Sequence, residues 1–210
     1  MMAQNRSTAV MQRRIEPHDS LDDFPTPLWA TRALLEHVLK FELNDSVWEP
    51  ACNRGFMARP LFEYFDKVWA TDIHDYGYEE MLDQHDFLMP FVTQQIKPDW
   101  IITNPPFRLA DQFVLRAREV ASKGCAFIVR SAFLEGITRY NELFSKTPPS
   151  IIAQFCERVP MVKARIDPQV SSATAYSWLI WEWSSNQTKF VWIPPCRKQL
   201  EREGDYDGKN

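Results

Sequence analysis

Residues 99–107 read DWIITNPPF. The apolar run predicts a strand that ends at Thr103, because the two prolines that follow cannot extend a hydrogen-bonded ladder and also restrict the backbone before them. Asn104 is then held at the edge of a sheet with little freedom to lose on binding a ligand. Its side-chain oxygen and the Pro105 carbonyl can both accept hydrogen bonds from an amino group, and Phe107 offers a flat face on which a planar molecule can stack.

Strands and helices alternate on both sides of this stretch. Apolar periodicity predicts strands at residues 46–48, 67–71, 99–103 and 125–129, and helices at residues 27–41, 56–65 and 109–121. Thr26 is the expected cap of the first helix, and Pro27 its first residue. The alternation predicts an α/β fold with a mostly parallel sheet. Residues 151–155 and 176–183 predict two further strands with no long helix between them, which favours an antiparallel pair at one edge of the sheet.

Unusual residues follow two other strands. In open parallel sheets, ligands bind beyond the carboxyl ends of the strands. The loop at residues 49–56, EPACNRGF, has small residues that allow a ligand near a helix start, and Asn53 tolerates a left-handed turn almost as well as glycine does. Asp72 ends the next strand, where an acid can accept hydrogen bonds from ribose hydroxyls. Taken singly, each feature is better explained as an ordinary turn than as a binding site.

Composition favours one folded domain. The chain has 210 residues, of which 45% are hydrophobic and 25% charged. We expect residues 1–20 to form a mobile arm, 21–195 a single domain and 196–210 a charged, frayed tail. The four cysteines show no CxxC pair and no zinc-ligand spacing to histidine, which predicts buried reduced thiols and no metal. No segment resembles a signal peptide or membrane span, so we expect a cytoplasmic protein without membrane contact; its oligomeric state stays open.

The net charge of −4 limits how the chain could contact nucleic acid. Proteins that coat nucleic acid usually carry a basic excess, so any contact here must come from a local basic patch. Residues 130–165 contain six basic residues against three acidic ones. The candidate phosphate contacts are Arg130, Arg139, Arg158, Lys163 and Arg165. Scattered solvated charge would explain the same count. The tryptophans at positions 178, 181 and 183 are expected to pack in the core.

Together these motifs resemble the S-adenosylmethionine-dependent amino-methyltransferases, above all the DNA adenine-N6 type in a small phage or bacterial form. The resemblance spans about residues 24–183. Asn104 to Phe107 match the family's catalytic Asn-Pro-Pro-aromatic motif, and residues 49–55 match its cofactor loop. The loop precedes the catalytic motif, as in the family's gamma arrangement. The resemblance implies a Rossmann-like class I methyltransferase fold, with a seven-stranded, mostly parallel sheet, one antiparallel strand and helices on both faces.

The resemblance also implies two sets of site residues. The catalytic set is Asn104, Pro105, Pro106 and Phe107. The set implied to bind the cofactor, S-adenosyl-L-methionine, is Phe24, Pro25, Thr26, Pro27, Glu49, Pro50, Ala51, Cys52, Asn53, Gly55, Asp72, Ile73, Asp86 and Phe87. In the family, the segment like 24–27 closes over the methionine end, the acid like Asp72 holds the ribose, and the pair like 86–87 contacts the adenine. Asn53 departs from the family by replacing a glycine.

The implied activity is methyl transfer from S-adenosylmethionine to the exocyclic N6 amino group of adenine in DNA, which leaves S-adenosyl-L-homocysteine. The chain has no room for a separate target-recognition domain, which implies a short target sequence or specificity borrowed from a partner. The same motif also serves RNA adenines and protein glutamines, although the glutamine type carries an N-terminal helical domain without a counterpart here. A non-catalytic nucleotide- or nucleic-acid-binding module with this fold is a further alternative. A nicotinamide dehydrogenase is disfavoured because the GxGxxG fingerprint is missing.

Overall fold

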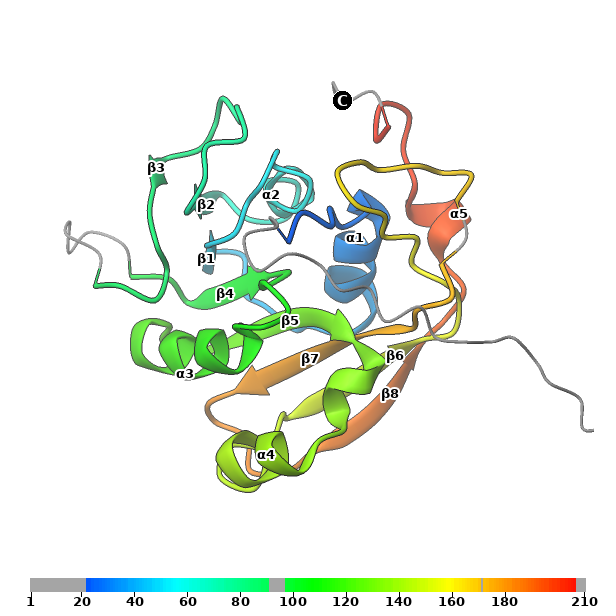
Figure 1. The fold of residues 1–210 in the computed structure, drawn as a ribbon. Coiled ribbons are helices and arrows are strands. Elements are labelled where there is room, and N and C mark those ends of the chain that lie inside the picture. The colour runs from blue at the N-terminus through cyan, green and yellow to red at the C-terminus, as the bar shows by residue number, and fades with distance from the viewer. Residues whose placement is uncertain (1–21, 91–96, 171, 207–210) are drawn as a thin grey trace, which may run out of the picture.

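The computed structural model describes residues 22–90, 97–170 and 172–206. The predicted arm at residues 1–20 lies outside these ranges, so the arm and its boundary with the domain stay a prediction. Within the described chain, strands and helices alternate as predicted up to the strand at residues 67–72 and again from the strand at residues 100–103 to that at 124–130 (Figure 1). Between residues 72 and 100 the described residues form no helix, so the predicted alternation is interrupted there.

Eight strands of the described chain form one sheet in the order β3-β2-β1-β4-β5-β7-β6-β8. Their bounds are β1 Ser46–Glu49, β2 Lys67–Asp72, β3 Asp83–Gln84, β4 Trp100–Thr103, β5 Gly124–Arg130, β6 Ile151–Phe155, β7 Tyr176–Glu182 and β8 Lys189–Ile193. β7 runs antiparallel to both of its neighbours, and the other pairings are parallel. The α/β class and the single antiparallel strand are therefore confirmed.

The expected count of seven strands is one too low. β8 pairs with β6 in parallel and forms the sheet edge, so the antiparallel pair β6–β7 lies one strand inside that edge. Ile193 is buried at the end of β8, whereas Phe190 and Trp192 are exposed on its other side. The sequence analysis did not predict this strand, although residues 190–193 are all apolar.

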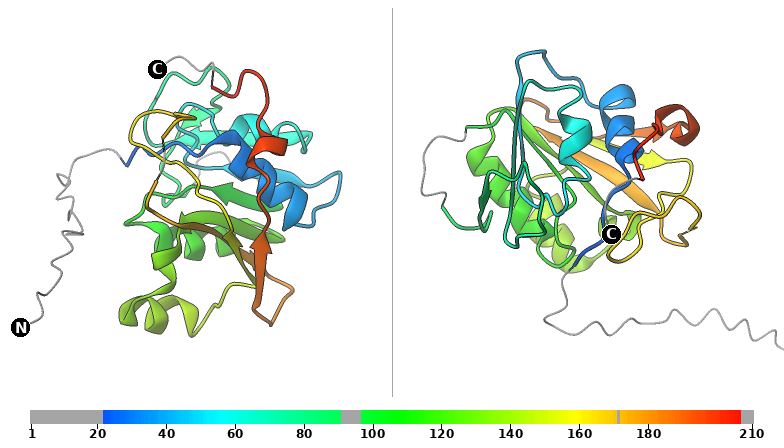
Figure 2. Two further views of the ribbon diagram at one scale, coloured as in Figure 1. Left: turned by 90° about the vertical axis from the view of Figure 1, so that its right-hand side faces the viewer. Right: turned by 90° about the horizontal axis from the view of Figure 1, so that it is seen from above.

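Helices cover both faces of the sheet. α1 (Leu28–His37) packs through Trp29 and Leu34 into one core cluster, and α3 (Ala110–Val120) packs through Phe113 into the other. Figure 2 shows the two helices on opposite sides of the sheet. Alternate residues of β5 and β7 enter the two clusters, which explains why both strands are apolar throughout. Trp178 and Trp181 are fully buried there, and Trp183 packs against the same core, as predicted.

The first helix begins later than its sequence suggests. Pro27 occupies the cap position with an extended backbone, α1 starts at Leu28, and the hydroxyl of Thr26 makes no capping bond. The helix also ends at His37 rather than near residue 41. The predicted helix at 56–65 reduces to α2 (Ala58–Leu61) with turns on either side, whereas α3 matches its predicted bounds to within one residue.

Beyond β5 the chain makes short helical turns and then returns to the sheet. These are a 3-10 turn at Ser131–Leu134, α4 (Ile137–Arg139) and a π-helical turn at Tyr140–Phe144. The C-terminal segment contains α5 (Arg197–Leu200), which lies beside α1 (Figure 2). The buried Asp205 binds Arg32 with both carboxylate oxygens at 2.7 and 2.8 Å. Residues 197–206 are thus packed onto the domain rather than frayed.

Candidate functional site

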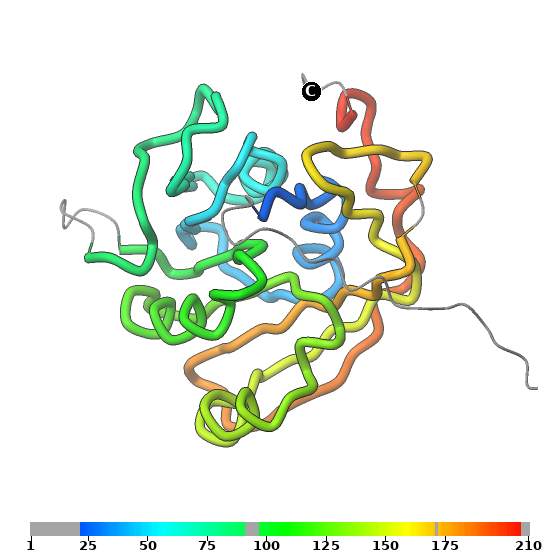
Figure 3. The backbone as a smooth tube through the Cα atoms, in the orientation of Figure 1, coloured from blue at the N-terminus to red at the C-terminus, as the bar shows by residue number. Residues whose placement is uncertain are grey.

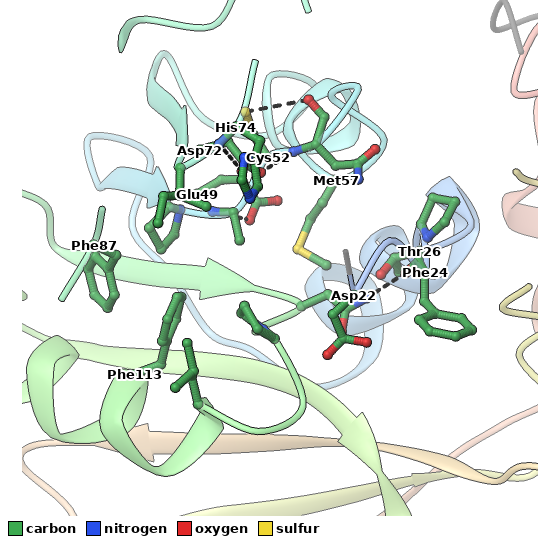
Figure 4. A pocket seen from close by; sticks show the side chains of 18 of the residues that line it. Asp22, Phe24, Thr26, Glu49, Cys52, Met57, Asp72, His74, Phe87 and Phe113 are labelled. Carbon is green, nitrogen blue, oxygen red and sulfur yellow. Dashed lines mark hydrogen bonds between the residues drawn. The ribbon is translucent and has the colours of Figure 1, made fainter. Parts of the chain in front are cut away.

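A pocket of about 820 Å³ opens beyond the carboxyl ends of β1, β2, β4 and β5. Its size lies within the range of small-molecule sites. Figure 4 shows side chains from several loops converging on it. The predicted residues that line it are Phe24, Pro25, Thr26, Glu49, Pro50, Ala51, Cys52, Asn53, Asp72, Ile73, Asp86, Phe87, Asn104, Pro106, Phe107 and Arg130. Most of the predicted site residues therefore lie together at the edge of the sheet where the parallel strands end.

Several predicted site residues do not line the pocket. These are Pro27, Gly55 and Pro105, each next to a lining residue, and the basic residues Arg139, Arg158, Lys163 and Arg165. Arg139 lies over the ring of Phe133 at 4.0 Å and bonds to Asp111 and to two backbone carbonyls. These bonds hold the guanidinium within the fold, and Arg139 does not line the pocket.

The pocket wall also contains residues that sequence reasoning missed: Asp22, Phe56, Met57, His74, Tyr76, His85, Arg108, Leu109 and Phe113. Leu109 and Phe113 had a visible signal, since their helical spacing marked them as apolar, but it indicated core. His74 directly follows the strand end of Asp72 and its neighbour Ile73. Asp22 has no local signal, because only the tertiary fold brings it to the site.

The loop after β1 turns sharply through two left-handed residues. Asn53 has φ of 50° and Gly55 has φ of 78°, which confirms the expected left-handed turn at Asn53. The Asn53 amide donates to Asp72 at 2.8 Å, and the His74 amide donates to the other carboxylate oxygen at 2.9 Å. Burial raises the pKa of Asp72, and these amide bonds act in the opposite direction. The loop and the end of β2 are thus joined through one carboxylate.

Glu49 is a buried carboxyl at the end of β1. It accepts a 2.5 Å hydrogen bond from the Thr103 hydroxyl and a 3.3 Å bond from the Ala51 amide. Burial raises its pKa to about 8, and the nearby charge of Asp72 adds to the rise. Glu49 is therefore mainly protonated at neutral pH, so the floor of the pocket carries less negative charge than its two carboxyls suggest.

Asn104 is held in one orientation. Its side-chain amide nitrogen donates to the Phe24 carbonyl at 2.8 Å, while its side-chain oxygen is buried without a hydrogen-bond partner among the described residues. The hydroxyl of Thr26, also in the pocket wall, is in the same condition. Because buried polar atoms are nearly always paired, these two atoms are available to hydrogen-bond a polar ligand or a water molecule in the pocket.

Phe107 forms a small aromatic cluster beside Asn104. Its ring lies 5.5 Å from that of Phe24, and the Arg130 guanidinium sits 4.1 Å from its centroid. The Phe107 amide donates to the Asp22 carboxylate at 2.5 Å. Arg130 therefore covers one face of the ring that the sequence identified as a stacking surface.

Phe87 and Asp86 line another part of the pocket wall. Phe87 is almost fully buried and packs against Trp48 at 5.1 Å and Phe113 at 4.8 Å between ring centroids. Figure 4 shows Phe87 and Phe113 together at one side of the pocket. Asp86 accepts a bond from the Leu88 amide, which stabilises the turn after β3. An apolar wall with an adjacent carboxylate suits a flat, partly polar group.

Part of the basic segment lies close to the pocket. In the connection between β6 and β7, the Ala164 carbonyl accepts a bond from Arg54 at 2.7 Å and the Ala164 amide donates to the Asp23 carbonyl at 2.9 Å. The connection also carries Lys163 and Arg165, and Arg165 pairs with Asp167 at 3.4 Å. Two of the predicted basic residues, Lys163 and Arg165, therefore flank Ala164, which contacts residues adjacent in sequence to the pocket lining.

The remaining predictions concern metals, thiols and membranes. Within the described ranges, no group of three or more His, Cys, Asp or Glu side chains is placed to hold a metal. Cys52, Cys125 and Cys196 are buried and Cys156 is exposed, so the expectation of buried thiols is wrong for Cys156. Among the helices that the structure describes, none has the length and apolar character that a membrane crossing requires.

The chain is similar to known proteins in its structure and not in its sequence. No family model and no curated protein sequence matches the chain. A type I restriction-modification methyltransferase subunit from Streptococcus thermophilus matches with a TM-score of 0.57 and 10% identity over 88% of this chain and 50% of that one. A modification subunit from Vibrio vulnificus, provisionally described as part of a type I restriction enzyme, matches with a TM-score of 0.56 and 20% identity. The match covers 88% of this chain and 51% of that one.

A smaller protein from Pyrococcus horikoshii, provisionally described as an RNA methyltransferase, matches with a TM-score of 0.51 and 15% identity over 74% of this chain and 80% of that one. The chain spans about half the length of the two type I subunits. At these identities the likeness shows the fold. The chain therefore has the Rossmann-like fold of these methyltransferase structures.

Proposed function

We propose that the protein transfers a methyl group from S-adenosylmethionine to the exocyclic N6 amino group of adenine in DNA. The observation that carries the proposal is the orientation of Asn104. Its amide nitrogen is bonded to the Phe24 carbonyl, which leaves the buried side-chain oxygen as an acceptor within the pocket. An exocyclic amino group has two N–H donors, which this oxygen and the neighbouring Pro105 carbonyl could accept.

The residues of the pocket fit the cofactor. Asp72 has lone pairs left after its two amide bonds and could accept from ribose hydroxyls. Phe87 and Asp86 supply an apolar wall and a carboxylate for the adenine ring and its amino group. The unpaired hydroxyl of Thr26 could bond to the amino-acid end, near the segment of Phe24. The near-neutral Glu49 reduces the negative charge that the cofactor's carboxylate would meet.

The proposed reaction needs little acid–base help. The cofactor, when bound, supplies an activated methyl group. Asn104 and Pro105 would orient the target nitrogen by accepting hydrogen bonds from its two N–H groups. They would also stabilise the positive charge that develops on the nitrogen as the new N–C bond forms and the S–C bond breaks. The nitrogen then releases one proton to water. In a duplex the target base must first leave the stack, and Phe107 is the proposed stacking surface, with Arg130 moving off its face or covering the other side.

A methyl-transfer assay with radiolabelled S-adenosylmethionine tests the proposal. Unmethylated duplex DNA, single-stranded DNA, RNA and a protein extract are offered in parallel to the wild type and to Asn104→Ala. We expect label in DNA as N6-methyladenine, and a rate on the order of a hundredfold lower in the variant. Label confined to RNA or to protein glutamine would replace the proposed substrate. Cofactor binding without transfer to any of the four would favour a binding module instead.

A further inference from the structure

We propose that Asp22 and Asp23 are positioning residues of this site, and we call residues 22–24 the strap. Asp22 holds the turn that carries Asn104, and Asp23 holds the loop after β1. The strap's role in the reaction rests on the proposed function, whereas its contacts are properties of the fold. Figure 3 shows the start of the described chain, in deep blue, passing between the loop after β1 and the turn after β4.

The strap holds both ends of the turn at residues 104–107. The Phe24 carbonyl accepts from the Asn104 side chain at 2.8 Å, and the Asp22 carboxylate accepts from the Phe107 amide at 2.5 Å. Because the two intervening prolines have no N–H, Phe107 is the first backbone donor after Asn104. The strap therefore fixes the turn at the two points where it can donate hydrogen bonds.

Asp23 anchors the neighbouring loop. Its buried carboxylate accepts from the Asn53 side chain at 2.8 Å and pairs with Arg54 at 3.2 Å. Asn53 holds a left-handed backbone, which is unfavourable for a residue with a side chain, and its own amide bonds to Asp72. Asn53 thus links the two carboxylates, since its side chain bonds to Asp23 and its backbone amide bonds to Asp72. It also gives the asparagine a bond that a glycine at this position could not make.

A third contact extends the strap to the connection between β6 and β7. The Asp23 carbonyl accepts from the Ala164 amide, and Arg54 bridges the Asp23 carboxylate and the Ala164 carbonyl. Three consecutive residues therefore tie together the loop after β1, the turn that carries Asn104 and the segment with Lys163 and Arg165. The residues that the strap contacts come from three separate segments that are far apart in the sequence.

Calorimetric titration with S-adenosylmethionine tests the role of Asp23. We expect Asp23→Ala to raise the Kd about tenfold, and Asn53→Gly, which keeps the left-handed turn, to raise it by a similar factor. The double variant should bind no more weakly than Asp23→Ala alone, because both changes remove the same bond. Asp66→Ala removes an exposed acid outside the pocket and serves as the control. An unchanged Kd in Asp23→Ala, or fully additive effects in the double variant, would overturn this part.

Hydrogen exchange tests the contacts without any need for activity. Asp22→Ala should speed exchange of the Phe107 amide about tenfold, whereas Asp22→Asn, which keeps an acceptor oxygen, should preserve its protection. Asp23→Ala should speed exchange across residues 52–55. Unchanged exchange in both alanine variants would overturn the strap, provided that thermal unfolding shows them folded. A change would sustain it even if the wild type neither binds the cofactor nor transfers a methyl group, which would defeat only the proposed function.

Where the wild type is active, kinetics separate positioning from mere stability. Asp22→Ala should lower the transfer rate at saturating cofactor about tenfold with less than a threefold change in cofactor Kd. Asp23→Ala should act mainly on the Kd. Recovery of the rate in Asp22→Asn would support the positioning role, and equal loss in Asp22→Asn and Asp22→Ala would contradict it.

Discussion

The Thr26 hydroxyl has no hydrogen-bond partner among the described residues although it is buried in the pocket wall. Thr26→Val keeps the side-chain shape and removes the unpaired group. We expect the free energy of unfolding to stay equal or to rise by up to about 1 kcal/mol, because an unpaired buried hydroxyl is unfavourable. Cofactor affinity should fall about fivefold, since one hydrogen bond to the ligand is lost. Denaturation and calorimetry measure the two effects, and Thr26→Ser is the matched control. Unchanged affinity in Thr26→Val would remove Thr26 from the proposed site.

Glu49 predicts a pH dependence of stability. Its pKa of about 8 in the folded chain lies above its ordinary value of 4.5, so the folded protein retains a proton that the unfolded chain releases. The stability linked to this proton is fully present below pH 4.5 and is lost as the pH rises through 8. We expect this loss to reach as much as roughly 5 kcal/mol by pH 9.

Glu49→Gln isolates this effect, because glutamine keeps the neutral shape of the protonated side chain. Urea denaturation at pH 5, 7 and 9 should show the variant gaining on the wild type as the pH rises. A difference between the two proteins that stays constant across this range would show that Glu49 is not protonated in the fold.

At the scale of the element, Gly55 in the loop after β1 and Gly77 in the loop after β2 allow the cost of a left-handed backbone to be separated from the cost of a steric clash. Gly55 and Gly77 both have φ near 78°, but a Cβ at Gly55 would lie 2.2 Å from the ring of Tyr78, whereas one at Gly77 would meet nothing within 4 Å. Gly77→Ala should therefore cost about 1 kcal/mol of unfolding free energy from the backbone alone. Gly55→Ala should cost about 2–3 kcal/mol, because the clash adds to it. Equal values from urea denaturation would show that the Tyr78 ring yields freely.

The elements that the sequence predicted well are those with a strong local pattern. β5 is apolar throughout and buried on both faces, and α3 has a clear apolar stripe, so both match their predicted ranges closely. β8 has a single buried residue, Ile193, and exposes two aromatic rings at the sheet edge, so it lacks the alternation expected of a half-buried strand. α2 is shorter than predicted: Phe56 lies in the turn before it, and Phe65 comes after the turn that follows it.

At the scale of the whole molecule, the site was predictable where topology dictates it. Parallel strands end at one edge, so Glu49, Asp72 and Asn104 were expected to meet, and they do line one pocket. The strap was not predictable in this way. Asp23 lies 30 residues from Asn53, and Phe24 lies 80 residues from Asn104, with no periodicity linking them. Two adjacent acids in a polar stretch are typical of a solvated surface.

The packed C-terminal segment is a second consequence of tertiary structure. Arg32 is buried in α1 and binds both Asp205 and Glu63, with distances of 2.7 Å to each. Both partners stabilise the charged guanidinium and raise the pKa of Arg32, against the effect of its burial. The buried guanidinium of Arg32 thus joins α1, near the start of the domain, to the C-terminal segment that contains Asp205. The number of charged residues in that segment does not predict this contact.

This arrangement predicts a non-additive pair of variants. Asp205→Ala should lower the free energy of unfolding by about 3 kcal/mol, because it leaves a buried guanidinium with one carboxylate in place of two. Arg32→Met in the same background should recover most of that loss, since it removes the uncompensated charge and fills the space with an apolar side chain, while Glu63 keeps its 3.0 Å pair with Arg202. Urea denaturation of the wild type, both single variants and the double variant measures the coupling. A double variant that is destabilised by the sum of the single effects would mean that Asp205 holds the C-terminal segment through contacts other than the Arg32 charge.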